Sequence, residues 1–178
     1  MILGALFVGA IILGASSVSL AQSQQSISDE EVNYVVSNCT SAQSSLNRIH
    51  RNDTSLRLDR GRQFEFISSK LMARLNSRLA LSQFDAGELV NITAKYSKAT
   101  DEFRDAYYQY ETKLSQILKI NCHDSPVEFY DGTQEARQKR KVVLDRVTEV
   151  NKLADDYYKE FNQLRSEYKT AVMGVQND

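Results

Sequence analysis

Apolar residues recur at steps of three and four along three long segments of the chain, which is the spacing of one face of an α-helix. The first segment opens at Ser28 and Glu31, whose spacing matches a helix capping box. Its apolar stripe continues to Leu75, so the pattern predicts a helix over 29–81. The middle of the stripe is polar, and the pattern leaves open whether the helix bends near Gly61, which lies there. The stripe comprises Val32, Val35, Cys39, Ala42, Leu46, Ile49, Asp53, Leu56, Arg60, Phe64, Ile67, Leu71 and Leu75.

Two further stripes each follow a helix-start signal. Asp85 stands where a capping residue is expected, and the heptad spacing that follows predicts a helix over 86–120. Pro126 stands at a first helical position, where its missing N–H costs nothing, and the stripe after it predicts a helix over 126–173. Residues 131–133 can interrupt the first turns of this last helix.

Short connections make consecutive helices antiparallel, so we expect the three stripes to meet along one seam. The predicted fold class is all-α, with three long antiparallel helices forming an elongated coiled-coil-like bundle, roughly 50–75 Å long at about 1.5 Å per residue. Counting back from each turn predicts two layers across the seam. They are Phe64 with Phe103 and Val143 or Leu144, and Leu71 with Tyr96 and Val150.

The N-terminal segment has the pattern of an export signal. No charged residue precedes Asp29, and the small-x-small sequence Ser19-Leu20-Ala21 predicts cleavage after residue 21. The alternative is an uncleaved membrane anchor over 2–20, which is just long enough to span a bilayer. Either alternative predicts an exported chain that is periplasmic, on the cell surface or secreted. The predicted parts are a signal peptide or anchor at 1–21, a polar linker at 22–28, a helical bundle at 29–174 and a tail at 175–178.

Cys39 and Cys122 are the two cysteines of the chain. Counting residues from the first predicted turn puts them at similar heights at the same end of the rod. An even pair in an exported chain favours a disulfide. The alternative of a redox or metal pair is weak, because there is no Cys-x-x-Cys and no third thiol, and we predict neither a metal site nor a cofactor.

The charges are nearly balanced, with 22 basic and 23 acidic residues. The chain therefore lacks the excess of basic residues that is typical of nucleic-acid-binding proteins. The charges are nevertheless clustered along the chain. Two arginine-rich stretches are expected to lie at one level opposite tyrosines of the second helix, with Arg60 and Arg140 facing the seam. These residues are Arg57, Arg60, Arg62, Arg137, Arg140, Tyr107 and Tyr110.

This Arg/Tyr section allows two interpretations. The first is structural, with interhelical ion pairs and arginine–tyrosine stacking that fill a section of the seam without leucines. The second is a binding site for phosphate, carboxylate or an acidic cell-envelope polymer. The structural interpretation is favoured because Asp101, Glu102 and Asp105 are close enough along the second helix to neutralise the arginines.

Two stretches resemble recurring sequences in uncharacterised exported helical proteins of reduced-genome, candidate-phylum bacteria. They are the region from Arg48 through Gly61-Arg-Gln-Phe-Glu-Phe-Ile-Ser-Ser-Lys-Leu, and the region from Asn121-Cys122 through Ala136-Arg-Gln-Lys-Arg. The resemblance implies a bacterial envelope context and no activity, so no site residue is carried over from it.

No catalytic motif is present: there is no glycine-rich phosphate loop, no Gly-x-Ser-x-Gly and no His-Glu-x-x-His. The leading hypothesis is therefore an exported, non-enzymatic helical interaction or structural protein of the cell envelope that self-associates or binds a protein partner. One alternative is a periplasmic chaperone-like holder of unfolded clients. Another is a binder of a small anion or acidic polymer through the Arg/Tyr section. Contact with a membrane is expected only through the N-terminal segment if it stays uncleaved.

Overall fold

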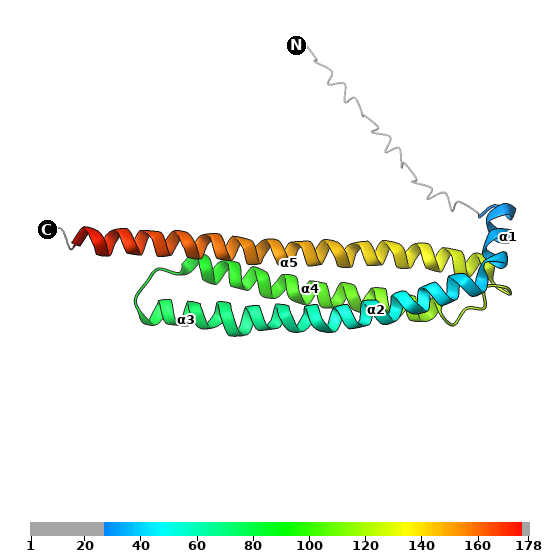
Figure 1. The fold of residues 1–178 in the computed structure, drawn as a ribbon, viewed down its shortest axis with the longest axis horizontal. Coiled ribbons are helices and arrows are strands. Elements are labelled where there is room, and N and C mark those ends of the chain that lie inside the picture. The colour runs from blue at the N-terminus through cyan, green and yellow to red at the C-terminus, as the bar shows by residue number, and fades with distance from the viewer. Residues whose placement is uncertain (1–26, 176–178) are drawn as a thin grey trace, which may run out of the picture.

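The computed structural model describes residues 27–175, and every regular element within that range is a helix (Figure 1). This confirms the all-α prediction. The predicted export segment at 1–21, most of the linker and the last three residues of the tail lie outside the described residues. None of the helices between 27 and 175 is long and apolar enough to cross a membrane.

The single helix predicted over 29–81 is wrong, because this segment forms four consecutive elements. They are α1 (Asp29–Ser37), α2 (Cys39–Phe66), the π-helix η1 (Ile67–Met72) and α3 (Ala73–Leu81). Ser28 and Glu31 form the predicted capping box at the start of α1. The chain changes direction at Asn38, so α1 points away from the axis of α2 (Figure 1). Gly61 lies inside α2, which has no break there.

The π-helix changes which residues of the first arm face the core. Its wider turns hold more residues than α-helical turns, so the side chains after it are shifted by about one position around the axis. Met72 is consequently 2% exposed, whereas Leu71, which the spacing placed in a core layer, is 52% exposed. The predicted layer of Leu71 with Tyr96 is therefore wrong.

The remaining helices are α4 (Gly87–Ile117) and α5 (Pro126–Val175). Asp85 is not the capping residue of α4, because Ala86 holds that position and the Asp85 carboxylate accepts a hydrogen bond from the Gly87 N–H at 3.0 Å. α5 continues through residues 131–133, so the predicted interruption does not occur. Gly132 allows a close approach there, since a Cβ at this position would lie 2.9 Å from Cγ1 of Ile117 on α4.

α4 contributes more buried hydrophobic residues to the core than any other described helix. It contacts α5 along its length on one side and α2, η1 and α3 on the other, whereas α2 and α5 make few backbone contacts with each other. Figure 1 shows α4 lying lengthwise between α5 and the α2–α3 arm. The rings of Phe64 and Phe103 meet edge to face with centroids 5.4 Å apart, as their predicted layer requires. Tyr96 and Val150 are both fully buried.

Candidate binding groove

Asp53 on α2 is the one charged residue that is buried in the described part of the chain, and three helices meet at it. Arg140 on α5 donates two hydrogen bonds to its carboxylate, from Nε to Oδ2 at 2.8 Å and from Nη2 to Oδ1 at 3.0 Å. The Tyr110 hydroxyl on α4 donates a third to Oδ2 at 2.7 Å. Such a bidentate guanidinium–carboxylate pair is among the stronger and more directional polar contacts in proteins. We call these three residues the polar bridge.

The electrostatics of the polar bridge keep its ion pair charged. Burial by itself would raise the pKa of Asp53, but the hydrogen bonds from Arg140 and Tyr110 outweigh it and hold that pKa below its usual value. The hydrogen bonds to Asp53 raise the pKa of Arg140. Burial and the adjacent carboxylate raise the pKa of Tyr110, so its hydroxyl stays a proton donor at neutral pH.

A cavity of about 240 Å³ opens beside the polar bridge, between α2 and α5 and above α4. Leu56 and Leu144 lie at its mouth and are 58% and 55% exposed, although both line the cavity. Arg57 and Arg60 also line it. Its remaining apolar walls are Phe103, Val143 and Val147.

Two more cavities continue the same opening toward the N-terminal end of α2. The second has a volume of about 320 Å³ and shares Tyr110 and Arg140 with the first, so the polar bridge separates the two. The third has a volume of about 490 Å³, lies between α1 and α5, and shares Phe129 and Arg137 with the second. The three cavities follow one another between α1–α2 and α5, and we call this row of cavities the α2–α5 groove.

The structure brings five of the seven predicted Arg/Tyr residues to the first cavity. Arg57 stacks over the ring of Tyr107 at 5.1 Å, in the predicted arginine–tyrosine contact, and Tyr110 and Arg140 form the polar bridge. Arg60 also lines the cavity, but it is exposed and donates a hydrogen bond to the Gln63 side chain at 3.2 Å.

The other two predicted arginines lie elsewhere. Arg62 forms an exposed pair with Asp59 within α2 at 2.7 Å, outside the groove. Arg137 lines the second and third cavities and contacts Gln134 at 3.4 Å.

Of the three acidic residues predicted to neutralise the arginines, Glu102 pairs with an arginine of α5, Arg146, at 2.9 Å. Asp101 pairs with Arg104 at 3.0 Å. Neither contacts the arginines of the groove. The carboxylate that neutralises Arg140 is Asp53, which stands on the apolar stripe of the first helix and could have been recognised from that position.

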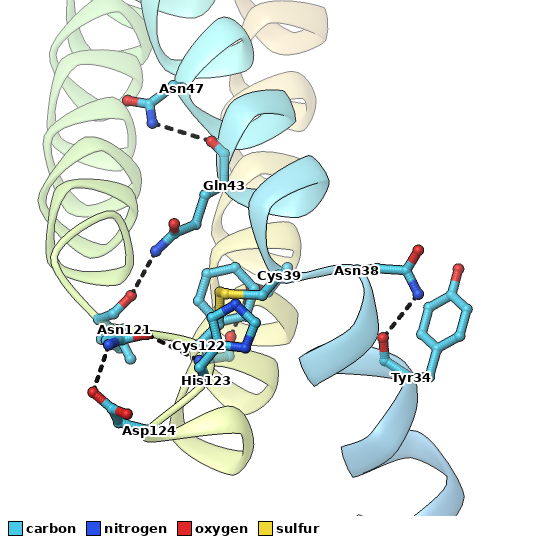
Figure 2. The surroundings of a disulfide bond; sticks show 12 residues. Tyr34, Asn38, Cys39, Gln43, Asn47, Asn121, Cys122, His123 and Asp124 are labelled. Carbon is cyan, nitrogen blue, oxygen red and sulfur yellow. Dashed lines mark hydrogen bonds between the residues drawn. A yellow bond between two sulfur atoms is a disulfide. The ribbon is translucent and has the colours of Figure 1, made fainter.

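The disulfide between Cys39 and Cys122 is present, which confirms the predicted pairing (Figure 2). Its Cα atoms are 5.5 Å apart and both residues are buried. The bond joins the first residue of α2 to the loop between α4 and α5. The Gln43 side chain reinforces the junction by donating to the Ile120 carbonyl at 2.9 Å. The disulfide therefore fixes one end of the α2–α5 groove.

A second buried polar network lies at the opposite end of the molecule and was missed by the sequence reasoning. Asn76 on α3 donates to Thr93 of α4 at 2.8 Å and accepts from the Tyr157 hydroxyl of α5 at 2.8 Å. Burial raises the pKa of Tyr157 to about 12. The network joins α3, α4 and α5, so a polar connection is present at both ends of the core.

No group of three or more histidine, cysteine or acidic side chains within residues 27–175 is arranged to hold a metal ion. Comparison with protein-family models, with curated proteins and with solved structures finds no match for this chain. The resemblance to exported helical bacterial proteins therefore stays a prediction from the sequence.

Proposed function

We propose that this chain is an exported, non-enzymatic helical interaction protein of the cell envelope, and that the α2–α5 groove receives a helix from a protein partner, which includes a second copy of the chain. The observation that carries the proposal is the exposure of Leu56 and Leu144. Both side chains line the groove and yet leave more than half of their surface in water. Covering apolar surface of this kind is the main driving force of association.

The dimensions of the groove fit a helix. Its lining residues on α5 run from Phe129 to Val147, which is about 27 Å at 1.5 Å per residue. An amphipathic helix of this length presents apolar residues at i, i+3, i+4 and i+7, and grooves between helices commonly receive such helices. With this fourth helix, three antiparallel arms would close into a coiled-coil-like bundle.

The charge of the groove indicates an acidic partner helix. Arg57, Arg60 and Arg137 line the groove, and none forms an ion pair with another described residue. Carboxylates on the partner helix would form ion pairs with these arginines and so fix the position of the docked helix along the groove. Arg140 is not available for this role because Asp53 already neutralises it.

Photocrosslinking in the producing cell tests this proposal, because the chain offers closely matched controls. A photoreactive amino acid replaces Leu56 or Leu144 in the groove, and Leu58 or Val142 on the same two helices in the control chains. Leu58 and Val142 are 52% and 46% exposed but do not line the groove. We expect adducts from the groove positions alone, each mapping to one helix of the partner.

With the photoreactive residue at Leu56, Leu144→Asp should abolish the adduct and Val142→Asp should retain it. With the photoreactive residue at Leu144, Leu56→Asp should abolish the adduct and Leu58→Asp should retain it. Equal adducts from groove and control positions would contradict docking in the groove. Sedimentation of the purified chain then distinguishes a second copy from another partner, because only the former raises the mass of the chain alone.

The unpaired arginines also favour a second candidate, the binding of a small anion in the first cavity. Arg57 and Arg60 lie at the edge of a cavity of about 240 Å³, which is slightly smaller than typical small-molecule sites. Thermal shift against phosphate, sugar acids and acidic polymers tests this candidate. A shift that Arg57→Gln/Arg60→Gln removes would support it, and an unchanged melting temperature with every anion would exclude it.

Export itself rests on the predicted N-terminal signal and is supported by the disulfide, because structural disulfides persist mainly outside the reducing cytosol. Fractionation of the producing cells, followed by sequencing of the mature N-terminus, tests it. Residue 22 as the first residue would indicate cleavage, and an intact N-terminus in the membrane fraction would indicate the anchor.

A further inference from the structure

The outer surface of the first arm is basic at its far end, where η1 and α3 lie. No acidic residue occurs between Phe66 and Phe84, although the chain as a whole carries slightly more acidic than basic residues. Lys70, Arg74 and Arg78 follow one another at steps of four residues, and all three are exposed. The near-zero net charge of the chain therefore conceals a strongly basic local surface.

These cations share a helix face with large apolar side chains. On α3 the core side is formed by Asn76 with its half-buried neighbours, and Arg74, Arg78 and Leu81 project from the opposite side. The wider turns of η1 bring Lys70 and Phe66 close to the same line, because a step of four residues there is nearer to one full turn. We call this surface the tip face, and it comprises Phe66, Lys70, Leu71, Arg74, Arg78 and Leu81.

The tip face has no partner among the described residues. Phe66, Leu71 and Leu81 are 55%, 52% and 85% exposed. None of the three cations of the tip face forms an ion pair in the described part of the chain, in contrast to Arg62 on α2 and Arg104 on α4. Unpaired cations beside exposed apolar side chains are the combination that favours an interface carrying both negative charge and hydrocarbon.

We propose that the tip face docks on an anionic lipid surface. Phe66 and Leu81 enter the boundary between headgroups and acyl chains, and Lys70, Arg74 and Arg78 bind lipid phosphates. The helix lies on the surface and does not cross it, since no described helix is long and apolar enough to do so. A soluble acidic polymer would satisfy the cations and leave the three apolar side chains in water, so the apolar residues favour lipid.

The proposal is independent of the α2–α5 groove, which lies on a different surface. A local readout in the full chain avoids interference from the apolar N-terminal segment. An azide-bearing amino acid replaces Ser77, an exposed residue between Arg74 and Arg78, and carries an environment-sensitive fluorophore. The fluorescence is titrated with vesicles of phosphatidylcholine containing 30% phosphatidylglycerol, and with vesicles of phosphatidylcholine alone.

We expect a blue shift with the anionic vesicles that weakens as salt is added. Each basic residue near an anionic surface contributes about 1 kcal/mol, so Lys70→Gln/Arg74→Gln/Arg78→Gln should raise the half-saturating lipid concentration on the order of 100-fold. The matched control removes three exposed cations of α5 that also form no ion pair within residues 27–175, and should leave the titration unchanged. This control variant is Lys152→Gln/Arg165→Gln/Lys169→Gln.

The apolar contribution is tested separately with Phe66→Ser/Leu81→Ser, which should also weaken binding to anionic vesicles. Each variant is shown to be folded by a helical circular dichroism spectrum and a melting temperature equal to those of the parent chain. If Phe66→Ser/Leu81→Ser does not fold, the single variant Leu81→Ser takes its place, because Leu81 is the most exposed of the apolar residues. An equal response to neutral vesicles, or none to anionic ones, would overturn the proposal. A response to soluble polyphosphate, with vesicle binding unaffected by Phe66→Ser/Leu81→Ser, would overturn it in favour of an acidic polymer.

Discussion

Replacing Arg140 by methionine keeps most of the apolar stem and removes both hydrogen bonds to Asp53. The Asp53 side chain, which is 11% exposed, then retains only the Tyr110 hydroxyl as a donor. Removing one partner of a fully buried ion pair costs about 3–5 kcal/mol, whereas an exposed pair contributes about 0–1 kcal/mol. Because the Arg140 side chain is 46% exposed, solvent screens the pair, and we expect an intermediate loss. That loss is about 2 kcal/mol of unfolding free energy on these scales.

A double-mutant cycle measures the interaction itself. Urea unfolding of Arg140→Met, Asp53→Ala and the double variant should give a coupling energy of about 1–2 kcal/mol, because the residues are in direct contact. The matched control is the exposed pair of Arg62 and Asp59, which has a similar separation of 2.7 Å. Its cycle, with Arg62→Met and Asp59→Ala, should give less than about 0.5 kcal/mol.

Thermal unfolding of the same variants provides a second measurement of this loss of stability. For a domain of this size, a loss of about 2 kcal/mol lowers the melting temperature by about 4–8 °C. If the coupling between Asp53 and Arg140 is as small as that of the exposed control pair, the polar bridge does not hold α2 and α5 at their separation, and the reasoning is refuted.

The lowered pKa of Asp53 means that its stabilising contribution is complete above its ordinary pKa of 3.8 and is lost as the pH falls through the lowered value. Urea unfolding should therefore show the advantage of the parent chain over Asp53→Asn shrinking below about pH 4. Gly132→Ala should lower the unfolding free energy by about 1–3 kcal/mol, because the new Cβ meets Ile117 of α4. Gly61→Ala has open space around it and should raise the unfolding free energy by about 0.5–1 kcal/mol. Calorimetric melting that shows a change of the same sign for both variants would contradict the packing of α5 on α4. Cys39→Ser/Cys122→Ser should cost about 4–5 kcal/mol in chemical unfolding, since the bond closes a separation of 83 residues, and a stability equal to that of the parent would contradict this.

The parts of the fold that were predictable from sequence are those determined by local or evenly spaced signals. The capping box at Ser28 and Glu31 forms because both partners lie within one turn of the chain. Heptad spacing located α4 to within a few residues at its C-terminal end, since its apolar residues repeat without a break. The pairing of Cys39 with Cys122 followed from counting residues on both sides of a turn.

The exposure of Leu71 shows where such counting fails. An extra residue in the wider turns of η1 moved the core position to Met72 and then placed Asn76 in contact with Tyr157. A spacing of three and four fits residues 64–75 equally well without a π-helix, so the sequence pattern alone does not distinguish the two arrangements. The choice depends on how η1 packs against α4, which is a tertiary effect.

In the sequence, the polar middle of the first apolar stripe indicated a weak centre of the helix. The structure gives these polar residues a different role. α2 is continuous through Gly61, so the polar residues there do not interrupt the helix. Asp53 and Arg140 instead meet across the opening between α2 and α5, and the two side chains occupy space that leucines would fill in a tightly closed seam. A bidentate ion pair joins the two helices at a separation that leaves cavities on both of its sides. The interruption of the apolar stripe is therefore what produces the groove, and the exposure of Leu56 and Leu144 at its edge follows from the same separation.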